Sequence, residues 1–177
     1  MLPASGLRDA YSALTIDAWV YPLSHGADTA YGGGYGRTLI SNTNTDGFAL
    51  RVINGYVQAD LRLTGGNVLH TFGQAQLSLA AWSHVALTYD GSQVSAYLNG
   101  QLLGSKAASG VVRNAQNAGT YAMVGNEPDG PAVQAGGFGW HGHIDDLEIF
   151  NRALSAQEIQ SIYDRGAGAC QMTTISP

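Results

Sequence analysis

The feature that most constrains the fold is the run AWSHVALTYDGSQVSAYLNGQLL at residues 81–103. It contains two candidate hairpin turns, Asp90-Gly91 and Asn99-Gly100. An Asp or Asn followed by Gly suits a tight hairpin turn, because both central residues then need positive φ angles. Between the turns, residues 94–98 alternate apolar with polar or aromatic side chains, as a half-buried strand does. The run therefore predicts a β-meander and an all-β protein.

Turn-marked strand patterns continue through most of the chain, with a single helix near the end. The further expected strands are 14–21, 48–53, 56–63, 68–72, 76–79, 121–124 and 143–150. Ser155 and Glu158 form a capping box for the helix, and Gly166 stands where a helix ends. We expect a two-sheet antiparallel β-sandwich (jelly roll) with one short C-terminal helix, as a single domain over residues 1–168 followed by a flexible tail at 169–177.

Composition limits the classes of partner that the chain is expected to bind. Hydrophobic residues make up 45% of the chain and charged residues 12%, so a sizeable core is available. The eight Lys and Arg are scattered singly in a chain of net charge −5, which argues against nucleic acid as a partner. No apolar run approaches the length of a membrane span, and the first residues lack the pattern of a signal peptide. The lone Cys170 excludes an internal disulfide.

Three segments carry a family resemblance. They are LTIDAWVYP at 14–22, AWSHVALTYDGSQVSAYLNGQLLG at 81–104, and GHIDDLEIFNRALSAQEIQSIYDRG at 142–166. In order and spacing they resemble the laminin G-like, concanavalin A-like lectin/glucanase jelly-roll superfamily, and the third segment resembles its bacterial laminin G-like members. The resemblance implies the jelly-roll fold, an extracellular or cell-surface location, and a place in a larger protein.

The start of the chain departs from the family pattern. Members usually carry a strand before the one at 14–22, whereas this chain opens at MLPA. A missing or shortened first strand would leave unpaired backbone groups at a sheet edge. We therefore expect that the chain can form a homo-oligomer through that exposed edge.

Asp145 is the leading candidate for a metal ligand. Counting by two along the last strand puts it on one face with Leu147 and Ile149, and a carboxylate on a core-facing row needs a partner. The resemblance implies a structural calcium ion here, and Asp9 and Asp17 lie in the segment expected to approach it. Two alternatives stay open: backbone amides of a neighbouring loop could satisfy Asp145, and Asp17 could be a solvated strand residue.

A catalytic carboxylate pair is not expected. Superfamily members that resemble laminarinases carry Glu-x-Asp-x-Glu on one strand, which projects nucleophile and acid from one face. The nearest match here is Asp145 with Glu148, and strict alternation would put these two on opposite faces. His141 and His143 have no Cys or third His at metal-site spacing, so we expect a hydrogen-bonding or surface role for both. The chain is predicted not to be an enzyme.

Loop-borne aromatic residues are the expected ligand-binding groups. Tyr31 and Tyr35 flank a glycine-rich loop and Trp140 follows another, so these loops can present rings to a sugar without backbone strain. Polar contacts would come from residues near these loops. The full candidate set is Tyr31, Tyr35, Arg37, Asn126 and Trp140. A core position for Trp140 stays open, and Trp19 and Trp82 are expected in the core.

The function predicted from these observations is non-catalytic, lectin-like recognition of a glycan or a protein surface. A structural, adhesion or oligomerisation spacer is the alternative, and a glycoside hydrolase is a third reading that the carboxylate pattern disfavours. Calcium is the possible structural cofactor.

Overall fold

A computed structural model describes residues 10–25, 37–43, 46–113, 122–126 and 138–166. Ten strands and one helix lie in these residues. Their bounds are β1 Leu14–Pro22, β2 Arg37–Ser41, β3 Gly47–Ile53, β4 Tyr56–Arg62, β5 Val68–Phe72, β6 Ser83–Tyr89, β7 Gln93–Leu98, β8 Gln101–Ala107, β9 Met123–Val124, β10 Gly142–Phe150 and α2 Ala156–Arg165.

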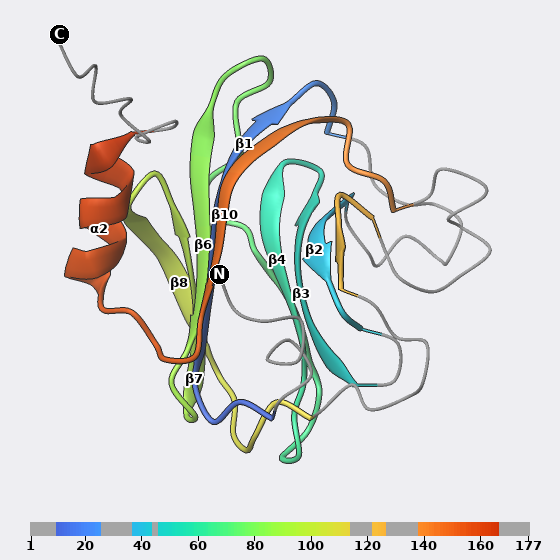
Figure 1. Cartoon of the computed structure of the whole chain (residues 1–177), viewed down its shortest axis with the longest axis vertical. Coiled ribbons are helices and arrows are strands. Elements are labelled where there is room, and N and C mark those ends of the chain that lie inside the picture. The colour runs from blue at the N-terminus through green and yellow to red at the C-terminus, as the bar shows by residue number, and fades with distance from the viewer. Residues whose placement is uncertain (1–9, 26–36, 44–45, 114–121, 127–137, 167–177) are drawn as a thin grey trace, which may run out of the picture.

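The strands form two five-stranded sheets that face each other (Figure 1). The first sheet has the order β10-β1-β6-β7-β8 and the second has the order β5-β4-β3-β2-β9. Neighbouring strands are antiparallel throughout. The two-sheet sandwich predicted from the turn spacing is therefore confirmed. Among the described residues, no helix has the length and apolar character needed to cross a membrane.

Two of the three predicted hairpin turns have the positive φ angles that the Asn-Gly or Asp-Gly sequence requires, and the third does not. Asn54 and Asn99 have φ angles of 51° and 50°, and the glycine after each is also positive, as the two-residue turn requires. Asp90 is not among the residues with positive φ. Its carboxylate instead accepts hydrogen bonds at 2.8 Å from the backbone amides of Ser92 and Gln93. This turn is therefore held by the Asp side chain rather than by a left-handed residue.

Two strand predictions need correction. Residues 76–79 form no strand: Leu77 is buried and its amide donates to the Gly55 carbonyl at 2.8 Å, so the segment packs as irregular chain. Conversely, β2 was not predicted, and it lies between β3 and β9 in the second sheet.

The core lies between the two sheets. Alternate residues of β1 point into it, and Ile16, Ala18 and Val20 are fully buried. On the facing sheet, Val57 and Leu61 of β4 are equally buried. Each fully buried Val, Ile or Leu side chain contributes about 1.5–3 kcal/mol to folding. This period-two burial fixes which side chains of β1 point outward.

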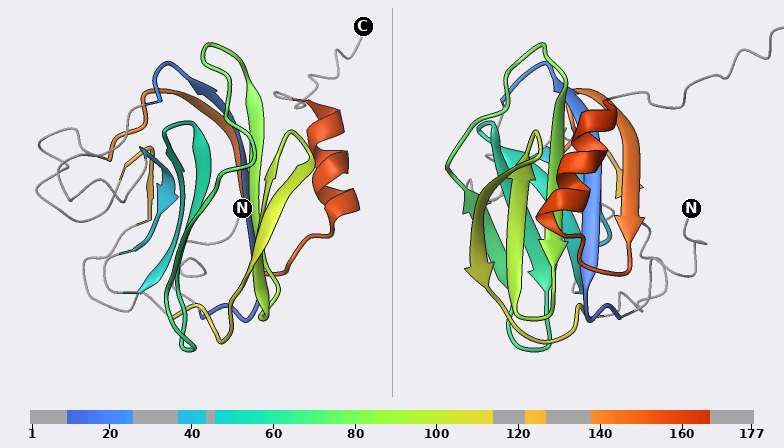
Figure 2. Two further views of the ribbon diagram at one scale, coloured as in Figure 1. Left: turned by 180° about the vertical axis from the view of Figure 1, so that it is seen from behind. Right: turned by 90° about the vertical axis from the view of Figure 1, so that its left-hand side faces the viewer.

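The helix α2 lies against the outer face of the first sheet (Figure 2). Its capping box is present as predicted, with the Ser155 hydroxyl accepting from the Glu158 amide and the Glu158 carboxylate accepting from the Ser155 amide. Ile159 is fully buried in a second apolar cluster with Ala86 of β6 and Tyr97 of β7. The helix is thus fixed over the middle strands of this sheet.

A β-bulge interrupts β10. Asp17 of β1 pairs with Glu148, but Trp19, two residues further, pairs with Asp145, three residues away along β10. Asp146 has the φ angle of 46° that such an extra residue often adopts. Strict alternation therefore fails here. Ile144, Leu147 and Ile149 all pack against the core.

Asp145 is consequently exposed, and its predicted place on a core-facing row is wrong. It pairs with Trp19, whereas Glu148 pairs with Asp17, and both partners are outward-facing positions of β1. Asp145 and Glu148 therefore lie on the same outer face, because the extra residue reverses the alternation between them.

Candidate functional site

The outward faces of β1 and β10 form a row of paired side chains. From one end to the other, the pairs are Tyr21 with His143, Trp19 with Asp145, and Asp17 with Glu148. At the Asp17 end the row is covered by α2, because the ring of Tyr163 stacks on Trp19 with 5.6 Å between the ring centroids. At the Tyr21 end, His143 is exposed. The row therefore has a covered half and an open half.

The open half carries three aromatic rings that contact one another, which we call the aromatic platform: Tyr21, Trp82 and His143. The ring centroid of Tyr21 lies 5.7 Å from that of Trp82 and 5.6 Å from that of His143, and Trp82 and His143 are 6.4 Å apart. Trp82 is 41% exposed, so its predicted core position is wrong. It lies just before β6 begins. Trp19, by contrast, is buried as expected.

Backbone contacts hold the start of β10 against the end of β1. The Leu23 amide donates to the His141 carbonyl at 2.9 Å. Gly142 allows this approach, since a Cβ there would clash with the Tyr21 carbonyl oxygen. The Trp140 indole donates to the His143 carbonyl at 3.2 Å. The position of the His143 ring beside Tyr21 is therefore set by main-chain geometry.

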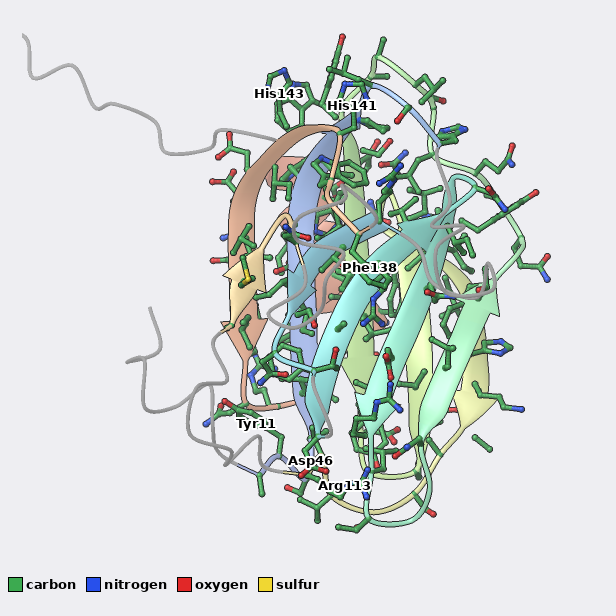
Figure 3. All side chains as sticks on the ribbon, turned by 90° about the vertical axis from the view of Figure 1, so that its right-hand side faces the viewer. Tyr11, Asp46, Arg113, Phe138, His141 and His143 are labelled. Atoms are coloured by element: carbon green, nitrogen blue, oxygen red, sulfur yellow. The ribbon has the colours of Figure 1, made fainter. Side chains whose placement is uncertain are left out.

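Polar and apolar groups border the platform. The His141 ring lies 3.1 Å from the Ser24 hydroxyl, and both histidines lie at one end of the sandwich (Figure 3). Leu23 and Leu79 are each 47% exposed. They belong to one neighbourhood, because the Ala80 amide donates to the Pro22 carbonyl at 2.8 Å. This end therefore combines exposed rings, apolar margins and imidazole groups.

Beneath α2 lies a buried carboxylate–imidazole pair. Asp17 Oδ2 is 3.3 Å from His84 Nε2, and both residues are fully buried. Asp17 Oδ1 and His84 Nδ1 have no hydrogen-bond partner among the described residues. The alternative that Asp17 is a solvated strand residue is therefore wrong, because the helix and its aromatic contacts cover it.

A groove of about 390 Å³ lies between α2 and β10. Its lining consists of Trp19, Asp146, Leu147, Glu148, Ile162, Arg165 and Gly166. Desolvation raises the pKa of Glu148 above its ordinary value, and the negative charge of Asp17 raises it further. Arg165 opposes this shift. The lining of the groove thus combines two carboxylates and one guanidinium with a buried aromatic ring.

The outer face of the second sheet carries a different kind of cluster. Asp60 is fully buried and lies 2.7 Å from Arg51 Nη1 and 3.1 Å from Arg62 Nε. Arg51 also donates to the Thr43 hydroxyl at 3.1 Å. Sequence reasoning missed this cluster, although the Asn54-Gly55 turn sets a register that places Arg51 diagonal to Asp60. The buried Asp60 carboxylate is thus paired with two guanidinium groups of its own sheet.

Comparison with known proteins identifies the family. The model of the concanavalin A-like lectin/glucanases superfamily matches residues 2–160. The chain belongs to this superfamily. No curated protein matches it in sequence.

Solved structures of this superfamily fold share the architecture at low identity. The carbohydrate-binding module CBM40 of the Ruminococcus gnavus IT-sialidase, bound to α2,3 sialyllactose, is 20% identical with a TM-score of 0.68 and matches 90% of this chain and 86% of its own. Domain 4 of the extracellular arabinanase AbnA from Geobacillus stearothermophilus, in complex with arabinotriose, is 16% identical with a TM-score of 0.58, over 86% and 67%. A putative carbohydrate binding protein from Bacteroides ovatus is 17% identical with a TM-score of 0.63, over 86% and 41%.

The predicted ligand residues fall partly outside the described chain. Tyr31 and Tyr35 lie outside the described residues. Trp140 is half-buried, packs against the core and donates its amide to the Gly125 carbonyl at 2.8 Å, next to Asn126. Arg37 begins β2 and is also half-buried. A role for these five residues in binding stays a prediction, and the platform lies on other residues.

The calcium site predicted from the superfamily resemblance has few donors in the described chain. Asp145 Oδ1 accepts from the Asp146 amide at 2.9 Å, Asp17 faces His84, and Asp9 lies outside the described residues. Among the described residues, no three His, Cys, Asp or Glu side chains converge as metal ligands. Calcium binding therefore stays a prediction.

Asp145 and Glu148 are the nearest match to the carboxylate pair of the glucanases. Asp145 and Glu148 share the outer face, so the argument that separated them is wrong. Glu148 nevertheless lines the groove with Asp146, and Asp145 is not part of that lining. The two carboxylates that line the groove are therefore Asp146 and Glu148, and Asp145 is not among its lining residues.

Proposed function

We propose that this chain is a non-catalytic carbohydrate-binding module whose ligand stacks on the aromatic platform. The observation that carries the proposal is the cluster of half-buried Tyr21 with exposed Trp82 and His143, whose ring centroids lie 5.6–6.4 Å apart at the open end of the first sheet. Sugar rings present apolar C–H faces that stack on such aromatic surfaces, while their hydroxyls need polar neighbours. Imidazole and hydroxyl groups at His141 and Ser24 supply these.

The structural neighbours support the same class of ligand. Two of them are described as bound to oligosaccharides, sialyllactose in one and arabinotriose in the other. The arabinanase domain belongs to an extracellular enzyme, and this chain spans 41% of the Bacteroides ovatus protein. We therefore place this module outside the cell, within a larger protein.

Recognition without catalysis is favoured by the arrangement of carboxylates. Asp145 is exposed and accepts a hydrogen bond from the neighbouring amide, and it does not line the groove that Glu148 enters. None of the three platform residues is an Asp or Glu. A spacer role or self-association through a strand edge has no comparable observation in its favour.

A glycan array on wild type, Trp82→Ala and Leu102→Ala tests the proposal. Leu102 is the matched control, because it is exposed but lies on β8, at the opposite edge of the sheet from β10. We expect wild type and Leu102→Ala to bind the same glycans and Trp82→Ala to lose them. Equal binding by all three would contradict the proposal, and repeating the array with EDTA tests the calcium prediction.

A further inference from the structure

We propose that the aromatic platform binds one sugar unit of a soluble glycan chain and does not bind the flat face of an insoluble polysaccharide. The inference rests on the proposed function and names the class of ligand that the same site takes. It depends on the angles between the three rings, on the exposure of each ring, and on the side chains that bound the platform along the sheet.

The three rings of the platform do not lie in one plane. The ring plane of Tyr21 makes an angle of 61° with that of Trp82 and of 51° with that of His143. The planes of Trp82 and His143 are tilted by 37° from each other. A sugar unit stacks on an aromatic ring when its C–H face lies parallel to the face of that ring. A flat polysaccharide surface can therefore lie parallel to only one of these rings at a time.

The rings also differ in how much of each a ligand can reach. Tyr21 is half-buried, whereas Trp82 and His143 are exposed. Of the Phe, Tyr and Trp side chains in the described part of the chain, Trp82 alone is exposed, and the others are half-buried or buried. The centroid of His143 lies 6.4 Å from that of Trp82, close enough for both rings to contact one sugar unit. Trp82 is therefore the main stacking surface, with His143 beside it.

The platform does not continue along the sheet toward α2. On β1 the outward residue next to Tyr21 is Trp19, and on β6 His84 comes two residues after Trp82. Trp19 is only 8% exposed, and His84 is fully buried. Tyr163 of α2 contacts both rings, with its centroid 5.6 Å from that of Trp19 and 6.4 Å from that of His84. A glycan chain that leaves the platform in this direction therefore meets no further ring on which to stack.

The other neighbours of the platform suit the substituents of a single sugar unit. Leu23 and Leu79 are each 47% exposed and offer apolar contact. The Ser24 hydroxyl and the His141 imidazole lie 3.1 Å apart and offer hydrogen bonds. A pocket for a small polar ligand combines an apolar surface with a few polar groups of this kind. Further units of a longer chain gain no second stacking contact here, so they should add little to the affinity.

A competition assay and a depletion assay test the inference. In the first, free glucose, galactose, mannose, fucose, arabinose, N-acetylglucosamine and sialic acid compete with the glycan selected on the array for wild type. We expect at least one of these monosaccharides to bind within about tenfold of the Kd of the whole glycan, because one central stacking contact supplies most of the binding energy. In the second, crystalline cellulose and crystalline chitin should remove no wild-type protein from solution.

Leu102→Ala is again the matched control and should behave as wild type in both assays, whereas Trp82→Ala should bind neither the glycan nor the monosaccharide. Failure of all seven monosaccharides to reach that tenfold limit would overturn the single-unit inference. Depletion of wild type by either solid would also overturn it. If Trp82→Ala loses the binding in either case, the proposed function still stands. Binding to no glycan on the array and to neither solid would overturn both proposals.

Discussion

The two halves of the outward row on β1 and β10 are built from similar residue types but used differently. In the covered half, Trp19 is buried under Tyr163 of α2 and Asp17 faces His84. In the open half, Tyr21 contacts Trp82 and His143, and α2 takes no part in these ring contacts. The comparison shows that an aromatic ring on this face is buried where the helix packs on it, as at Trp19, and stays at least partly exposed at Tyr21 and His143.

The largest expected effect is on the covered half. Ile159→Ala should lower the free energy of unfolding by about 2–5 kcal/mol, because it leaves a cavity in the cluster of Ala86, Tyr97 and Leu154. Denaturant unfolding measures this change. Glycan affinity at the platform should be unchanged, and a parallel loss of affinity would show that the two halves are not independent.

Removing the buried carboxylate should come next. Asp17→Ala leaves the fully buried His84 without its partner, so we expect a loss of about 1–3 kcal/mol in unfolding free energy. The milder Asp17→Asn keeps the shape and should lower the pKa of Glu148, since the charge of Asp17 contributes to raising it. An NMR titration in which the Glu148 carboxyl does not respond would contradict the electrostatic link.

A smaller effect is expected on the pH dependence of stability, to which Glu148 in the groove and Glu158 at the helix cap contribute with opposite signs. Because the folded-state pKa of Glu148 is raised, its ionisation makes stability fall as pH rises above the ordinary glutamate pKa. Glu148→Gln removes this loss, so its melting temperature should be slightly above that of wild type at neutral pH. A melting temperature clearly below wild type would argue that Glu148 supports the fold.

Glu158 should show the opposite sign. Hydrogen bonds from Arg152 and then Ser155 lower its pKa to about 2. Its contribution to stability is therefore present above the ordinary pKa of 4.5 and is lost as pH falls toward about 2. Melting curves of Glu158→Gln should be flatter than those of wild type across that range, and identical acid limbs would contradict the assignment.

Much of the fold was predictable, because it follows from local chemistry. The Asn54-Gly55 and Asn99-Gly100 turns and the capping box at Ser155 each need only a few neighbouring residues, and all three are confirmed. The short strand β2 was missed. It lies between β3 and β9, and a pattern within five residues cannot show partners that are far along the chain.

The candidate site was less predictable for two physical reasons. The bulge at Asp146 reverses the alternation of β10, and Asp-Asp carries no sign of it in the sequence. The platform joins Tyr21 of β1, His143 of β10 and Trp82 just before β6, three residues that only the tertiary register brings together.

The most direct test of the central claim is calorimetric titration of a glycan selected on the array into wild type and Trp82→Ala, with melting temperatures measured in parallel. Truncation of a central stacking ring should weaken binding by about tenfold or more, while an exposed side chain should leave the melting temperature nearly unchanged. Equal affinity of the two proteins for that glycan would contradict the assignment of the platform as the carbohydrate-binding site.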